Sequence, residues 1–80
     1  MNRIEIERIV RKFPAGTRIR LISMDDPQSP PPGTVGTVIT VDALGDLIMT
    51  WDNGSSLNIC PEIDRFEVIS SGAKETSANG

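Results

Sequence analysis

The 80-residue chain contains no histidine, no tyrosine and a single cysteine, and it has no continuous run of about 20 apolar residues. Without such a run, the sequence predicts no membrane-spanning helix. The lone Cys60 has no cysteine partner for an internal disulfide and no histidine to complete a zinc site. The first residues alternate charged and apolar side chains, unlike a secretory signal, so we expect a cytoplasmic protein.

The residue types that catalysis needs are also sparse. The serines have no histidine to activate them, and the chain has neither a phosphate-binding loop nor a dinucleotide fingerprint. Cys60 follows an apolar run, which favours a core position. Asp25, Asp26 and Asp52 have the chemistry of metal ligands or of a carboxylate pair, but aspartate before proline or Asn-Gly typically forms turns by bonding nearby backbone amides. We therefore expect no enzyme, metal or cofactor.

Charge is distributed unevenly along a chain that is long enough for one small domain. The net charge is −3, yet residues 1–20 carry six basic and two acidic side chains, whereas residues 21–80 carry two basic and nine acidic ones. Nucleic acid would be attracted to the first part and repelled by the rest.

The first segment has the spacing of an amphipathic helix. Its apolar residues share one stripe, at Ile6, Ile9, Val10 and Phe13. This pattern predicts a helix over about residues 3–12, which Pro14 and Gly16 end. We expect the stripe to cover an open end of the following domain. The alternatives are that the helix docks on a partner or lies with its basic face on nucleic acid.

From residue 17 onward the apolar period becomes that of strands, which are predicted at residues 17–23, 34–41, 47–52, 56–60 and 66–69. Residues 24–33 hold four of the six prolines and are predicted to form a stiffened loop. Gly36 lies inside a strand, where a bulge, a bend or a close backbone approach is the usual reason for glycine.

Turn signals connect these strands. Asn53-Gly54 predicts a type I′ hairpin between the third and fourth strands, and residues 61–65 suit one turn of 3₁₀ helix before the last strand. An OB barrel would carry a helix between those two strands, where the tight hairpin leaves no room. The order predicts an all-β, five-stranded SH3-like barrel at residues 14–69, preceded by the amphipathic helix at residues 1–13 and followed by a disordered tail at residues 70–80.

Several motifs support this fold by resemblance. They are PAGTRIRL at residues 14–21, MDDP at 24–27, GTVGTV at 33–38, VD at 41–42 and WDNGSSL at 51–57. Together they resemble an uncharacterised family of bacterial, phage and mobile-element domains of unknown function with an SH3-like core. The GTVGTV part alone is similar to the KOW motifs of ribosomal and transcription proteins. The resemblance implies a fold and no assigned activity.

Binding is the remaining class of function, and we weigh two surfaces. In the first hypothesis a protein partner contacts the acidic, proline-stiffened loop, with the candidates Met24, Asp25, Asp26, Pro27, Pro31 and Trp51. Trp51 would line an SH3-type peptide groove, although its phase with Leu47 and Met49 favours the core.

The second hypothesis is sequence-independent binding of nucleic acid through phosphate contacts. Its candidate residues are Arg8, Arg11, Lys12, Arg18 and Arg20. A third possibility is that the apolar stripe of the helix drives association of the chain with itself, so the expected state is a monomer or a weak dimer.

Overall fold

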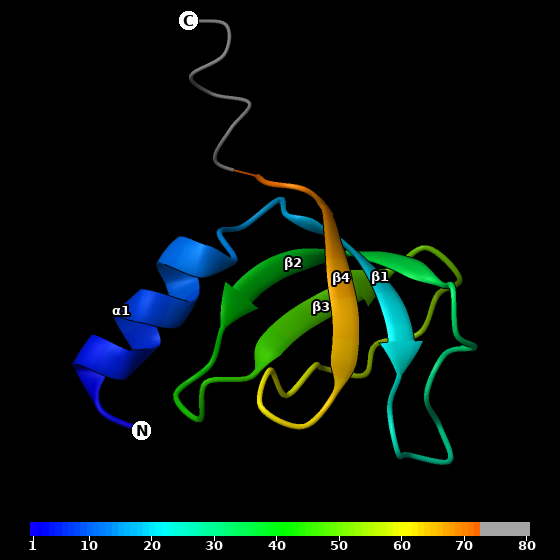
Figure 1. Ribbon diagram of the computed structural model, residues 1–80, viewed down its shortest axis with the longest axis horizontal. Helices are drawn as coiled ribbons and strands as arrows, with labels where there is room; N and C mark the ends of the chain where they lie inside the picture. Colours follow the sequence, from blue (N-terminus) through cyan, green and yellow to red (C-terminus); the bar gives the residue numbers. More distant parts are fainter. Residues whose placement is uncertain (73–80) are drawn as a thin grey trace, which may run out of the picture.

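A computed structural model describes residues 1–72, which form one helix and one four-stranded antiparallel sheet (Figure 1). The elements, in chain order, are α1 (Arg3–Lys12), β1 (Arg18–Ser23), β2 (Val35–Val41), β3 (Leu47–Trp51) and β4 (Arg65–Ser70). The sheet order is β3-β2-β1-β4, so the last strand returns to lie beside the first. Ile19 of β1, for example, lies opposite Gly36 of β2 on one side and Val68 of β4 on the other.

The core lies on one face of this strongly curved sheet. In Figure 1, β4 and β1 cross in front of β2 and β3, so side chains from both halves of the sheet meet. Alternate residues of the strands point inward, as a half-buried sheet requires. The buried apolar residues form one cluster of Phe13, Ile19, Leu21, Val38, Leu47, Met49, Trp51 and Ile59.

The predicted helix at residues 3–12 is confirmed. It begins with a capping box, in which the Asn2 side chain accepts the Glu5 N–H at 2.8 Å and the Glu5 carboxylate accepts the Asn2 N–H at 3.0 Å. No residue within the helix is buried, and Ile9 is the helical residue that packs partly against the core. The apolar stripe therefore covers the sheet less completely than expected, because Val10, a member of the stripe, remains exposed.

The predicted strand at residues 56–60 is reduced to a single bridge, so a five-stranded barrel is not confirmed. Ile59 exchanges backbone hydrogen bonds of 2.8 and 3.0 Å with Leu47, and the Trp51 N–H donates to the Ser55 carbonyl at 3.3 Å. These two pairs are in the same antiparallel register. Between them the Leu57 carbonyl accepts the indole N–H of Trp51 at 2.7 Å, which diverts it from a backbone ladder.

Two turns differ from their predictions. A type I′ turn at Asn53-Gly54 would need positive φ at both residues, but of the two only Gly54 has it, at 91°. The Gly54 N–H donates to the Trp51 carbonyl, so the loop has three residues and ends in a left-handed glycine. Residues 61–64 form a hydrogen-bonded turn rather than a 3₁₀ helix, with the Ile63 and Asp64 N–H groups both donating to the Cys60 carbonyl.

The C-terminal boundary of the domain lies beyond residue 69. Ser70 belongs to β4, and the Gly72 N–H donates to Oγ1 of the buried Thr17 at 3.2 Å. The predicted tail at residues 70–80 therefore begins too early, and residues 73–80 lie outside the described part. Gly72 also packs so closely that an added Cβ would lie 2.1 Å from the Ala15 carbonyl oxygen.

The predicted loop at residues 24–33 is folded against the sheet. The Ser29 N–H donates to the Asp26 carbonyl, the Gly33 N–H donates to the Leu21 carbonyl, and Pro30 is buried. Gly36, in the following strand, is a close backbone approach, because the ring of Trp51 packs directly on it. The register irregularity of β2 lies between Val38 and Thr40 instead.

Candidate binding groove

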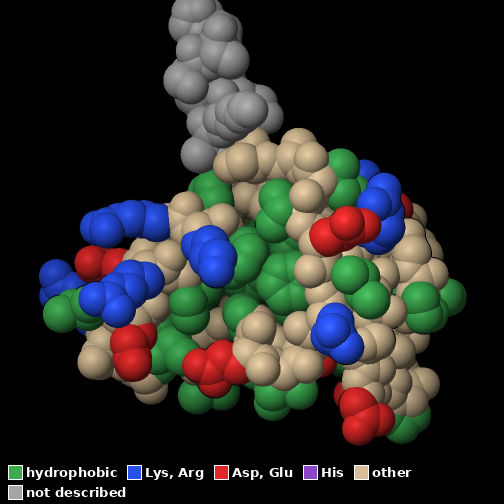
Figure 2. All heavy atoms as spheres, viewed as in Figure 1, with side chains coloured by type: hydrophobic (Ala, Val, Ile, Leu, Met, Phe, Trp, Pro, Cys, Tyr) green, Lys and Arg blue, Asp and Glu red, His purple; other side chains and the backbone are tan. Residues whose placement is uncertain are grey.

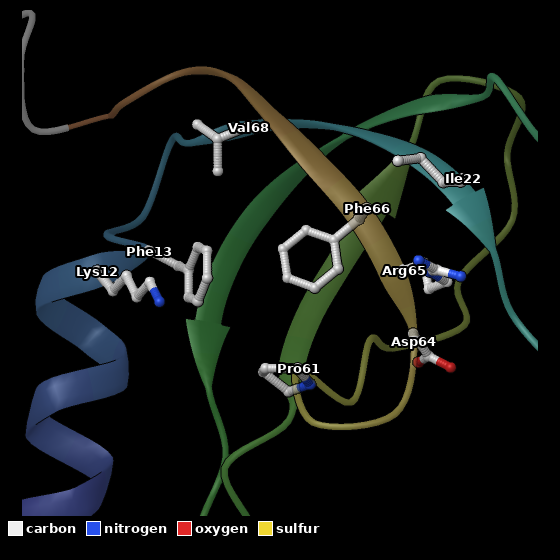
Figure 3. Close-up of a pocket in the computed structure, with 8 residues that line it drawn as sticks. All are labelled: Lys12, Phe13, Ile22, Pro61, Asp64, Arg65, Phe66 and Val68. Atoms are coloured by element: carbon white, nitrogen blue, oxygen red, sulfur yellow. The ribbon is translucent and has the colours of Figure 1, made fainter.

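A groove lies between the C-terminal end of α1, the side of β4 that faces the helix, and the turn at residues 61–64 (Figure 3). Its volume is about 520 Å³, within the range of roughly 300–1,000 Å³ typical of sites that hold small ligands. The lining residues are Lys12, Phe13, Ile22, Pro61, Asp64, Arg65, Phe66 and Val68. The groove therefore joins the N-terminal helix to the last strand.

Two aromatic rings form the floor of the groove. Phe13 follows α1 and Phe66 extends from β4 toward it, with ring centroids 5.5 Å apart in an edge-to-face arrangement. The Phe13 N–H donates to the Ile9 carbonyl at 2.8 Å, which holds this residue at the end of the helix. Beside the rings, Val68 and Ile22 are 46% and 49% exposed, so the floor offers apolar surface to an incoming side chain.

The rim of the groove is mainly basic. The Lys12 ammonium lies 5.7 Å from the centroid of the Phe13 ring, a cation–π distance that keeps it beside the aromatic floor. Arg65 is exposed on the opposite side. The carboxylate of Asp64 accepts the Cys60 N–H at 2.8 Å, so this acidic group holds the turn together. Figure 2 shows Lys and Arg side chains gathered over α1, next to the hydrophobic surface between α1 and β4.

The residues predicted for protein binding do not form one surface. Trp51 is 2% exposed and lies in the core, so its candidacy as a contact residue is wrong, because its indole is buried against Gly36. Met24 is partly buried against the same core. Asp25, Asp26, Pro27 and Pro31 are exposed on the loop before β2 and do not line the groove. The Asp26 carboxylate accepts the Gln28 N–H at 2.8 Å, the turn role expected of it.

The five residues predicted for nucleic-acid binding fall into two groups, one on β1 and one on α1. Arg18 makes a bidentate ion pair with Asp52, at 2.9 and 2.7 Å, and Arg20 pairs with Glu67. The expectation that Asp52 forms the turn is therefore wrong, because its carboxylate binds Arg18 of β1. In the turn, the Ser55 N–H donates to the side chain of Asn53 instead. The hydrogen bond from Arg18 holds the pKa of Asp52 below its usual value and raises that of Arg18.

The basic residues of α1 differ from the two arginines of β1 in their ion pairing. Arg8, Arg11 and Lys12 are exposed, and within residues 1–72 none of them forms an ion pair. One member of this group, Lys12, is the residue that reaches the groove. The predicted basic surface is therefore limited to α1, because Asp52 and Glu67 neutralise the two arginines of β1.

Sequence reasoning missed the groove itself. Three of its apolar residues have the spacing of ordinary strand residues, namely Ile22, Phe66 and Val68. Their exposure depends on which strand lies at the edge of the sheet, which the spacing does not indicate. The sequence did contain one relevant signal, because Arg65 and Glu67 alternate with apolar residues in the last strand. This pattern indicates an exposed apolar surface only when β4 is known to lie at the edge of the sheet.

Among residues 1–72, no group of three or more His, Cys, Asp or Glu side chains is placed to hold a metal ion. No helix in that part of the chain is long and apolar enough to cross a membrane.

The arrangement defines a class, a small antiparallel β domain with an N-terminal helix and an aromatic-floored groove between that helix and its last strand. The chain belongs to the family described as Domain of unknown function (DUF4314), whose model matches residues 2–69. The expected membership of an uncharacterised domain family is thereby confirmed. No curated protein and no solved structure matches the chain.

Proposed function

We propose that this domain is a non-enzymatic binding module that takes an extended segment of a partner protein into the groove between α1 and β4. The observation that carries the proposal is the Phe13–Phe66 floor lying beside a strand at the edge of the sheet. Peptide-binding domains commonly combine such an edge with pockets for alternate side chains. The exposed Val68 and Ile22 supply the apolar contact that a partner side chain would cover.

We also propose that the fold is an SH3-like barrel with one reduced strand. The last strand lies beside the first, and the segment around Ile59 lies beyond β3, which is the order of a five-stranded barrel. A cytoplasmic location and a monomeric or weakly dimeric state, both expected from the sequence, stay predictions.

A protein partner is favoured over nucleic acid by the charges. Arg18 and Arg20, two of the five basic candidates, are paired with carboxylates. The whole chain has a net charge of −3, which opposes association with a polyanion.

Selection from a displayed library of random peptides tests the proposal. Peptides enriched on the wild-type domain should lose most of their binding to the Val68→Gln variant, which removes an exposed aliphatic group from the groove. The matched control is Leu44→Gln, since Leu44 is 73% exposed in the turn between β2 and β3 and does not line the groove. Equal loss in both variants, or in neither, would refute the groove as the binding site.

The same selected peptides test the loop hypothesis. Asp25 and Asp26 are exposed and lie outside the groove, so the double change Asp25→Ala/Asp26→Ala should leave peptide binding unchanged. Loss of binding in this variant, together with retention in Val68→Gln, would transfer the function to the acidic loop.

A further inference from the structure

The last strand leaves one edge of the sheet accessible. Within residues 1–72, β4 pairs with β1 alone, and the side facing α1 has no strand beside it. Natural edge strands are commonly protected by charged side chains, proline, β-bulges or a short length. The six residues of β4 contain no proline, and three of them are Phe66, Val68 and Ile69. Of the two charged residues of β4, Glu67 pairs with Arg20 and Arg65 lines the groove. The backbone edge and the apolar floor of the groove thus lie together.

We propose that the groove binds an acidic, extended segment of a partner protein, which adds to β4 as a further strand. Its aliphatic side chains would cover Phe66 and Val68, and its carboxylates would lie near Lys12 and Arg65. This inference rests on the proposed binding function and specifies the chemistry of the partner.

Alternation along a strand explains how one segment meets both kinds of surface. Successive side chains of β4 point to opposite faces, so Phe66 and Val68 share the face that lines the groove and Glu67 lies on the other face. Arg65, the first residue of β4, is exposed and belongs to the lining at the end of the strand. An added strand would place its aliphatic side chains beside Phe66 and Val68 and a carboxylate near Arg65, because cross-strand neighbours lie about 4.5–5.5 Å apart. Lys12 would supply a second cation from the helix side.

The charges around the groove favour an acidic partner. Lys12 and Arg65 belong to the lining, and Arg11 lies in the same last turn of the helix as Lys12. Of the two nearby acids, Glu67 is paired with Arg20, whereas Asp64 keeps its negative charge while it accepts the Cys60 N–H. The lining therefore carries two cations and one carboxylate, which leaves one positive charge in excess.

A second copy of the chain fits less well. Pairing β4 with β4 of another molecule would bring the cations of both grooves close together. The one acid of β4, Glu67, is already bound to Arg20. Residues 73–80 are a poor match for the apolar floor as well, because they contain no aliphatic side chain larger than alanine.

Three synthetic peptides test the chemistry of the partner. The probes are the acidic peptide EVEIEV, its basic counterpart KVKIKV and the interrupted peptide EVEPEV, all with blocked termini. Titration into ¹⁵N-labelled full-length protein is followed by NMR at low ionic strength. EVEIEV should shift the amides of residues 65–70 and of Lys12 and Phe13. KVKIKV should bind at least about tenfold more weakly, and EVEPEV about two- to tenfold more weakly, because proline removes a ladder donor together with the isoleucine side chain.

Two charge reversals in the same turn of α1 provide the matched comparison. Lys12→Glu should weaken EVEIEV about two- to tenfold, because an exposed attraction is replaced by a repulsion. Arg11→Glu makes the same change in net charge and in the helix terminus, but Arg11 does not line the groove. Its effect should be less than about twofold and should fade as added salt screens it.

The outcomes separate this inference from the proposed function. If KVKIKV binds as well as EVEIEV at the groove, the acidic specificity is wrong and the binding function survives. If EVEPEV binds equally well, strand addition is wrong. If library selection yields no groove-dependent peptide at all, the proposed function itself fails. Sedimentation showing a stable dimer that excludes EVEIEV would assign the edge to a second copy and overturn the inference.

Discussion

Replacing Gly36 with alanine would place a methyl group against the ring of Trp51. A Cβ at Gly36 would lie 2.7 Å from Cε3 and 2.9 Å from Cδ2 of Trp51, and 3.0 Å from the Thr50 carbonyl oxygen. Real Cβ atoms do not approach so closely, and the ring cannot easily retreat, because Trp51 is buried and its indole N–H is bonded to Leu57. The added methyl therefore overpacks the core.

The expected change in the free energy of unfolding combines two destabilising contributions with one stabilising contribution. Overpacking a dense core typically costs about 1–3 kcal/mol, and weakening the indole hydrogen bond adds about 0.5–1.5 kcal/mol if the ring moves. Replacing glycine regains roughly 0.4–1 kcal/mol through the unfolded chain. We expect a net loss of about 1–3 kcal/mol. For a domain of this size, that loss lowers Tm by roughly 4–8 °C per kcal/mol.

Thermal and urea unfolding followed by circular dichroism measure this loss, and a double-mutant cycle tests its cause. In a Trp51→Phe background the smaller ring relieves the contact, so Gly36→Ala should cost at least about 1 kcal/mol less than in the wild type. Equal costs in both backgrounds would refute the steric explanation. An unchanged or raised Tm for the single variant would refute the geometry.

Three other predictions concern the ends of the sheet, its ion pair and its helix. Gly72→Ala should lower Tm, because a Cβ would collide with the Ala15 carbonyl oxygen, whereas deletion of residues 73–80 in the wild type should not lower it by a comparable amount. Arg18 holds the pKa of Asp52 below its unfolded value, so the pair's contribution is complete above about pH 4–5 and is lost as pH falls through the folded-state pKa. The Tm difference between wild type and Asp52→Asn should therefore narrow on acidification, and a difference that grows instead would contradict the assignment. Labelled RNA and DNA should show no more than weak binding at low salt that disappears by about 0.2 M salt, while binding that persists above this concentration would restore the nucleic-acid hypothesis.

Local signals in the sequence were sufficient for the helix and for most strand positions. The helix at residues 3–12 depends on its own spacing and on the cap at Asn2, both of which act within a few residues. The positions of β1, β2 and β3 follow from alternation, and of the three reasons expected for glycine at position 36 the structure shows the close approach. In each case the chemistry that decides the structure is near in sequence.

The missed features depend on contacts between distant segments. The strand at residues 56–60 is lost where the Leu57 carbonyl bonds the Trp51 indole, and no strand propensity reports such a bond. Asp52 does not form the expected turn, because its carboxylate pairs with Arg18 of a distant segment. The groove brings Phe13 to Phe66, so its existence depends on the strand order rather than on either local sequence.

The buried position of Trp51 has a consequence for spectroscopy. Because the chain has no tyrosine and one tryptophan, its intrinsic near-ultraviolet emission comes essentially from this single indole. The indole is held in the core by the Leu57 carbonyl, whereas the groove is floored by phenylalanine. Emission should therefore report unfolding of the domain and be little changed by a ligand in the groove. A partner segment carrying its own tryptophan would then be seen as a separate signal.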